Sequence, residues 1–91
     1  MTKRELEHLK SDYQYCYGQM LRVLKSKDEE AIKKEYEFIG GCHRMTCVIL
    51  GVGKKPAYAQ EIVTEWENEV LAEWENAEKE GRSPKMIWSE F

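Results

Sequence analysis

The chain has 91 residues, of which 42% are hydrophobic and 34% charged, a composition that excludes the disordered class and supplies one modest core. Residues 1–55 carry 11 basic and 8 acidic side chains and residues 56–91 carry 3 basic and 9 acidic, so the net charge of −3 divides into +3 and −6. We therefore do not expect direct nucleic-acid binding. The acidic half is the part of the chain that we expect to take part in binding a partner.

The first predicted helix covers about residues 3–25. Thr2 and Glu5 form a capping-box pattern, in which each side chain satisfies an orphan backbone N–H of the first turn. Apolar residues then recur at alternating spacings of three and four, which is typical of a helix with one face in a core. These residues are Leu6, Leu9, Tyr13, Cys16, Met20 and Val23.

The second predicted helix covers about residues 27–51. Ser26 and Glu29 repeat the capping-box pattern, so this helix should begin almost where the first ends and lie antiparallel to it. Two apolar stripes run along it, and its C-terminal half is therefore expected to be the most buried segment of the chain. One stripe holds Ile32, Tyr36, Ile39, His43, Thr46 and Leu50, and the other holds Ala31, Phe38, Cys42, Met45, Ile49 and Val52.

A glycine pair, Gly40 and Gly41, interrupts this second helix. Each glycine destabilises a helix by up to about 1 kcal/mol relative to alanine, so a kink or the close approach of another helix is expected there. A break into two helices is the alternative. Gly51 and Gly53 suit a left-handed end to the segment.

The third predicted helix covers about residues 56–80, with Pro56 in its first turn and Gly81 as its C-terminal cap. Its apolar arc includes Trp66 and Trp74, which we expect to be buried against the first two helices. The other side is nearly all glutamate. Together the three elements predict an all-α fold, a small three-helix bundle formed by a single domain over residues 1–91.

Residues 82–91 are predicted to be a docking tail, as a short helix or an extended arm. Ser83 and Pro84 suit a helix start, and four apolar residues follow within a few positions. They are Met86, Ile87, Trp88 and Phe91. A segment this apolar should dock on the bundle or on a partner.

Two groups of side chains raise the question of a metal or a catalytic centre. Cys42, His43 and Cys47, with Cys16 or His8 from the first helix, supply the ligand types for zinc, but their spacing lacks the paired elements of a zinc site. Cys42 beside His43 also lacks any signature of a cysteine nucleophile. We therefore predict three free thiols, with no metal and no cofactor.

Glu61, Glu65 and Glu69 stand four residues apart on the third helix, which is how helical bundles present carboxylates to metal ions. No Glu-x-x-His motif accompanies them, and on a helical wheel they lie away from the tryptophans. The spacing therefore predicts a solvent-exposed ladder of carboxylates. Such a ladder is suited to a basic surface on another protein.

These features favour a non-enzymatic protein-interaction module that binds a larger protein or self-associates as a homo-oligomer, with Glu61, Glu65, Glu69, Trp88 and Phe91 as candidate contact residues. One alternative is an acidic, partly nucleic-acid-mimicking inhibitor of a DNA- or RNA-handling protein, of the phage or mobile-element anti-defence type. An alternative of another class is a small metal- or cysteine-dependent enzyme. The charged N-terminus and the absence of a long apolar run predict a cytoplasmic protein without membrane contact.

Overall fold

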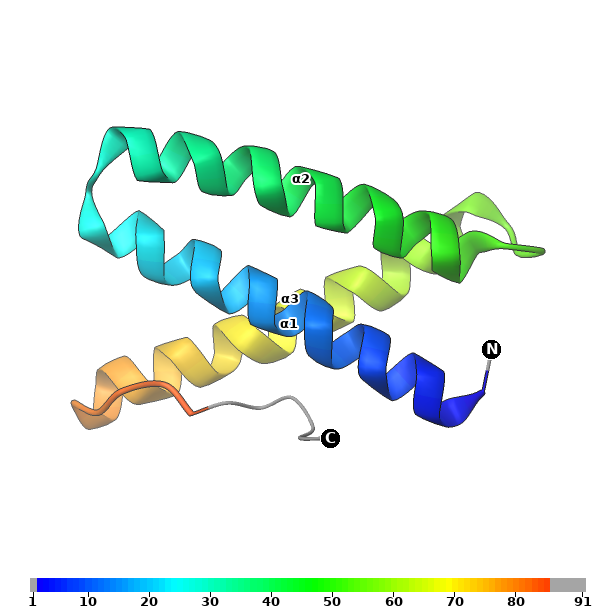
Figure 1. Cartoon of the computed structure of the whole chain (residues 1–91). Coiled ribbons are helices and arrows are strands. Elements are labelled where there is room, and N and C mark those ends of the chain that lie inside the picture. Colours follow the sequence, from blue (N-terminus) through cyan, green and yellow to red (C-terminus); the bar gives the residue numbers. More distant parts are fainter. Residues whose placement is uncertain (1, 86–91) are drawn as a thin grey trace.

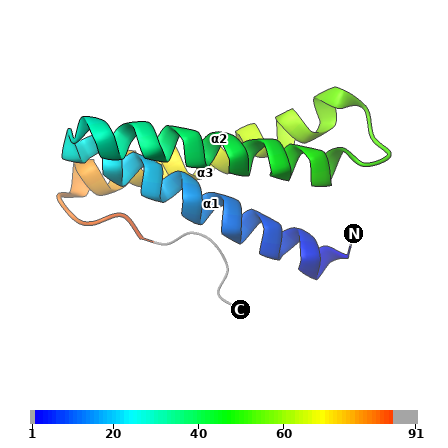
Figure 2. The same ribbon diagram turned by 45° about the horizontal axis from the view of Figure 1, so that its top comes forward.

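A computed structural model describes residues 2–85 of the chain. These residues form three helices, α1 (Lys3–Ser26), α2 (Glu29–Gly51) and α3 (Pro56–Glu80), which confirms the predicted all-α three-helix bundle. Helices α1 and α2 are antiparallel neighbours, and α3 crosses behind both (Figures 1 and 2). None of the three is long and apolar enough to cross a membrane.

Helix α1 begins at the predicted capping box. The backbone N–H of Glu5 donates to the Thr2 hydroxyl at 3.1 Å, and the backbone N–H of Thr2 donates to the Glu5 carboxylate at 3.1 Å. Two orphan donors of the first turn are thus satisfied locally.

The start of α2 differs from the prediction, because Asp28 and not Ser26 caps it. Ser26 is the last residue of α1, and Lys27 adopts a left-handed conformation with φ of 60°. The Asp28 carboxylate then accepts from the backbone N–H of Glu30 at 3.1 Å, so α2 begins at Glu29. A side chain at the position before the first helical residue satisfies these donors directly, and the second capping box predicted from the sequence was therefore wrong.

Tyr13 of α1 lies at the centre of the core, where all three helices meet. Its ring centroid lies 6.2 Å from that of His43 on α2 and 6.4 Å from that of Trp66 on α3. Its hydroxyl donates to the carboxylate of Glu67. The buried hydrophobic residues are Tyr13, Met20, Ile39, Leu50, Ala59, Val63, Trp66, Val70 and Ala77.

The two tryptophans of α3 have different environments. Trp66 is buried as expected, whereas Trp74 is only half-buried, with the Lys25 ammonium 4.8 Å from its ring centroid. The prediction that both are buried was therefore wrong for Trp74. It lies nearer the end of the bundle, where the Lys25 ammonium of α1 stands over its ring instead of an apolar side chain.

A polar contact joins α1 to α3 beside this core. The Gln14 side chain is fully buried, and its amide donates to the backbone carbonyl of Trp66 at 3.0 Å and to the Glu69 carboxylate at 2.7 Å. Lys10 forms an ion pair with Glu69 at 3.0 Å. The α1–α3 contact is therefore fixed by directional bonds as well as by apolar packing.

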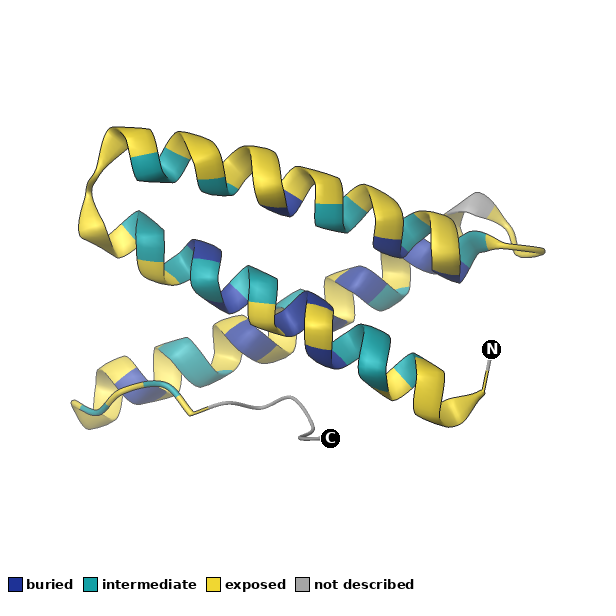
Figure 3. Cartoon of the chain, in the orientation of Figure 1, coloured by how far each residue is buried: buried dark blue, intermediate teal, exposed yellow. Residues whose placement is uncertain are grey.

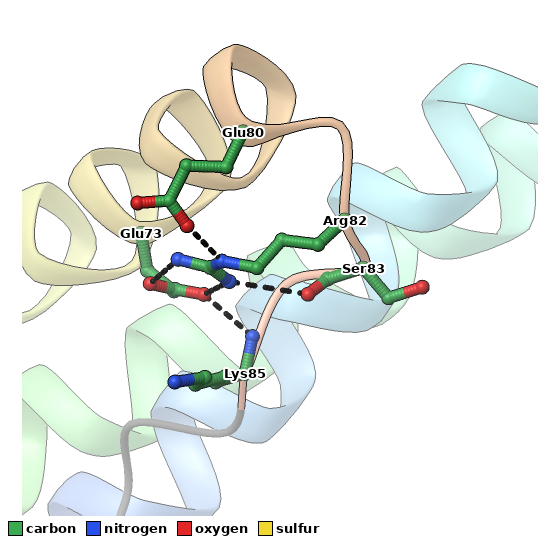
Figure 4. Close-up of polar contacts among 5 residues, drawn as sticks. All are labelled: Glu73, Glu80, Arg82, Ser83 and Lys85. Carbon is green, nitrogen blue, oxygen red and sulfur yellow. Dashed lines mark hydrogen bonds and ion pairs between the residues drawn. The ribbon is translucent and has the colours of Figure 1, made fainter.

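The chain turns back along α3 immediately after that helix ends. Gly81 takes the predicted left-handed cap, with φ of 69°. The Arg82 guanidinium then donates two bonds to the Glu73 carboxylate, at 2.7 and 3.1 Å, and the Lys85 backbone N–H adds a third at 2.6 Å (Figure 4). The Arg82 guanidinium, the Lys85 amide and the positive charges of both residues lower the pKa of Glu73 to about 2. Residues 82–85 are thus tied to Glu73 in the C-terminal third of α3.

The glycine pair neither breaks α2 nor admits another helix. Helix α2 runs through Gly40 and Gly41 without interruption (Figure 1). A Cβ atom built on either residue would meet no heavy atom within 4 Å. The expected close approach and the alternative break were therefore both wrong, because within the described residues this side of α2 faces open space.

We accordingly expect Gly40→Ala and Gly41→Ala each to raise the free energy of unfolding by about 0.5–1 kcal/mol, because alanine loses less backbone entropy in a helix and meets no atom here. Urea denaturation measures the effect. Gly53→Ala is the control and should destabilise, since Gly53 has φ of 72°. A loss of stability in Gly40→Ala or Gly41→Ala would show that the glycines are packed against another part of the protein.

Candidate functional site

The C-terminal half of α2, expected to be the most buried segment, is in large part exposed, and α2 is mostly yellow in Figure 3. In this half the exposed fractions are 61% for Met45, 60% for Val48 and 41% for Ile49, and they are 56% for Phe38 just before it and 76% for Val52 just after the helix. This prediction was wrong. An α-helix buries only the faces that neighbouring elements cover, and in residues 2–85 only α1 and α3 pack against α2.

Cys42 of the second stripe of α2 packs partly against the core, but the first stripe supplies the buried residues of this helix. Ile39, Thr46 and Leu50 of that stripe are buried. The second stripe, which includes Phe38, Met45 and Ile49, points to a side that the described residues leave open. A contiguous set of large apolar side chains in contact with water is uncommon in a small protein and marks a candidate interaction surface.

This open side forms a groove with a volume of about 510 Å³ between α1 and α2. No residue of α3 lines it. Residues of α1 and α2 in the lining are Leu9, Asp12, Tyr13, Cys16, Glu37, Phe38, Gly41, Cys42, Met45, Thr46 and Ile49. We refer to this surface as the α1–α2 groove.

Two carboxylates stand among the apolar side chains of the α1–α2 groove. Asp12 lies on α1 and Glu37 on α2, so each wall carries one negative charge. Both residues are exposed, and within residues 2–85 neither carboxylate has an ion pair or a hydrogen bond to a side chain. The groove thus combines an apolar floor with two carboxylates that no cation of the described chain neutralises.

Two thiols also line the groove. The Sγ atoms of Cys16 and Cys42 lie 3.7 Å apart, and both residues are half-buried. Burial, the hydrogen bond with Cys42 and the negative charge that Cys42 would carry raise the pKa of Cys16 to about 12. At neutral pH Cys16 is therefore a protonated thiol and a weak nucleophile.

The third thiol has a different neighbour. The Sγ atom of Cys47 lies 3.9 Å from Nδ1 of His43. Burial raises the pKa of the Cys47 thiol. The sequence had placed Cys42 beside His43, whereas in the structure Cys42 pairs with Cys16 and Cys47 with His43. Within residues 2–85, no three His, Cys, Asp or Glu side chains converge in a way that could hold a metal ion.

The carboxylate ladder of α3 is exposed along its length, but its members differ. Glu61 and Glu65 face solvent, whereas Glu69 accepts from Gln14 and pairs with Lys10 and so contributes to the α1–α3 contact. The two other predicted contact residues, Trp88 and Phe91, lie outside the described residues.

The groove residues Asp12, Glu37 and Met45 did not figure among the contact residues predicted from the sequence. The signal for Met45 was present, because the second apolar stripe of α2 was recognised but was assigned to the core, whereas no pattern singled out Asp12 or Glu37. A helix with two apolar stripes in so short a chain has more apolar surface than two neighbouring helices can cover.

Comparison of the chain with protein-family models, with curated proteins and with solved structures found no match.

Proposed function

We propose that this chain is a non-enzymatic protein-interaction module whose α1–α2 groove receives an amphipathic helix of a partner protein. The observation that carries the proposal is the exposure of Phe38, Met45 and Ile49 beside one another on the rim of this groove. Leaving such side chains in water lowers the stability of the isolated protein, and covering them would release about 25 cal/mol for each Å² of apolar surface removed from water.

The dimensions of the groove suit a helix. Its lining extends from Glu37 to Ile49 along α2, a length of about 18 Å at 1.5 Å per residue. A partner helix of about three turns would fill it, with apolar residues at positions i, i+3 or i+4, and i+7 as anchors. The furrow between two antiparallel helices is also where a further helix of a bundle packs.

The charges of the groove specify the edges of that partner helix. Because Asp12 and Glu37 stand on opposite walls, a helix with Lys or Arg on both sides of its apolar face would meet a carboxylate on each side. Charges at the rim of an interface mainly raise the association rate and exclude partners of like charge. The proposed partner is therefore a basic-edged amphipathic helix.

The alternative of a nucleic-acid mimic has less support. Mimicry needs a run of free carboxylates, because duplex DNA carries one charge for about every 1.7 Å of its axis. On α3, Glu69 is engaged by Lys10 and Glu73 by Arg82, which leaves gaps in the acidic face. The apolar groove is thus the stronger candidate for partner binding.

A synthetic helix tests the proposal. The probe is an 18-residue fluorescent peptide with leucine along one face and lysine along both edges, titrated with the full chain by fluorescence anisotropy. We expect Met45→Ala to weaken binding about tenfold, because one apolar anchor of the groove is lost. Val48→Ala is the matched control, since Val48 is equally exposed at 60% but does not line the groove. The affinity of this variant for the peptide should stay within about twofold of the wild-type value.

Both variants should keep the wild-type melting temperature, since neither residue is in the core. A second peptide, with glutamate in place of lysine, should bind several times more weakly. Equal affinities of the two variants for the lysine peptide would contradict the proposed site. Equal affinities of the wild-type chain for the two peptides would contradict the proposed charges at the edges of the partner helix. Concentration-dependent self-association that Met45→Ala abolishes would show that a second copy, and not a foreign helix, covers the groove.

A further inference from the structure

We infer that Cys16 and Cys42 are a disulfide site that links α1 to α2 at the floor of the α1–α2 groove, with a small-molecule disulfide such as oxidised glutathione as the oxidant. The inference rests on the placement of the two thiols and does not require the groove to bind a helix.

The two sulfur atoms are in non-bonded contact. Their separation is 3.7 Å, so a bond of about 2.05 Å requires a further approach of about 1.7 Å, shared between two helices. Cys47, the remaining thiol, lies beside His43 instead. The structure therefore selects one pair among the three cysteines.

The α2 backbone next to Cys42 can supply part of this movement. Gly41 precedes Cys42 directly, and a Cβ atom on Gly40 or Gly41 would contact nothing within 4 Å. A small shift of α2 at this point brings no side chain of either glycine position against another atom, because neither residue carries a Cβ and the space beside each is open. The glycine pair, which has no packing role among the described residues, thus makes the closure easier.

The thiols are also within reach of a dissolved oxidant. Both cysteines line the open groove and are half-buried rather than enclosed. Within residues 2–85 only α1 and α2 form the walls of the groove, so a tripeptide disulfide can approach from the side opposite α3. The same opening allows a small dithiol to reduce the bond again.

The exchange proceeds in two balanced steps. The Cys42 thiolate attacks one sulfur of oxidised glutathione, which breaks that disulfide and releases one glutathione thiolate. Cys16, whose pKa of about 12 makes it a poor first nucleophile, then gives its proton to the solvent and attacks the Cys42 sulfur, which breaks the mixed disulfide and expels the second glutathione thiolate. The two glutathione thiolates take up the two protons that the protein thiols release. Two protein thiols are oxidised and one molecule of oxidised glutathione is reduced to two of glutathione.

The bond joins residues 26 positions apart on antiparallel helices. A cross-link across a loop of this length restricts the unfolded chain much more than the folded one, so the oxidised protein should be the more stable form. It also fixes the spacing of α1 and α2 where they form the groove floor. The site thereby couples the width of the groove to the thiol–disulfide balance around the protein.

The test incubates the full reduced chain with oxidised glutathione at mildly alkaline pH, which favours the thiolates. Mass spectrometry should show the loss of two hydrogen atoms, and digestion should yield one peptide pair joined through Cys16 and Cys42. The oxidised form should melt roughly 10 °C or more above the reduced form, and dithiothreitol should reverse the shift.

Two serine variants complete the experiment. Cys47→Ser should cross-link like wild type, and Cys16→Ser should stop at a mixed disulfide with glutathione at Cys42. Stable glutathione adducts on wild type without an internal bond, a bond to Cys47, or disulfide-linked dimers would each overturn the inference. Peptide binding is not used as a readout, so these results and those on the groove can fail separately.

Discussion

Trp66→Ala is expected to lower the free energy of unfolding by about 3–5 kcal/mol, because it removes a large buried side chain and leaves a cavity that the helices cannot close. Trp66 is 6% exposed, and its ring lies against Tyr13 at the point where the three helices meet. The total stability of so small a domain is of similar size, so the variant should be largely unfolded. Far-ultraviolet circular dichroism and urea denaturation measure the loss.

Trp74→Ala is the matched control on the same helix. Trp74 is half-buried and its ring carries the Lys25 ammonium, so its removal should lower stability by about 1–2 kcal/mol. Equal losses for the two variants would show that α3 presents a different face to the core. A Trp66→Ala variant that melts like wild type would contradict the packing of the bundle itself.

The helix bounds could be predicted from the sequence because local signals determine them. The predicted ranges of 3–25, 27–51 and 56–80 compare with Lys3–Ser26, Glu29–Gly51 and Pro56–Glu80 in the structure. Capping residues, the helical period and terminal proline or glycine are all read within a few positions of each end. The one displaced start, that of α2, arose where Ser26 and Asp28 both fit a cap and the conformation of Lys27 decided between them.

The orientation of α2 could not be predicted, because it depends on how many neighbours a helix acquires and not on its own period. Both stripes of α2 are regular enough to be buried, and a fourth helix would have covered the second. The candidate site was missed for that reason. Its apolar residues were recognised, but they were counted as core.

Contacts between residues that are distant along the chain could not be predicted from the sequence either. Gln14 bonds to Glu69 across 55 positions, and Arg82 engages Glu73 on the helix before it, so two members of the acidic face are held by partners that no local pattern specifies. The pairing of Cys16 with Cys42 is of the same kind. The sequence gives the number of charged groups and thiols, but the packing of the helices determines which of them come into contact.

Tyr13→Phe is expected to lower the free energy of unfolding at neutral pH by about 1–2 kcal/mol, because the Glu67 carboxylate loses its phenolic donor while the aromatic packing is kept. Burial first, and then the bond to Glu67 and its charge, raise the pKa of Tyr13 above the usual range of a phenol. The folded chain therefore keeps a proton that the unfolded chain releases near pH 10.

The sign of the pH effect follows from that difference. A raised pKa in the folded state gives a contribution to stability that is complete below about pH 10 and is lost as the pH rises further. Wild type should therefore lose stability steeply in alkali, and Tyr13→Phe should lose it less steeply, with the remaining slope coming in part from Tyr17, whose pKa burial also raises. Urea midpoints between pH 7 and 11 measure both slopes. Tyr36→Phe, at a side chain 54% exposed, should behave like wild type throughout, and a Tyr13→Phe slope equal to the wild-type slope would contradict the buried hydrogen bond to Glu67.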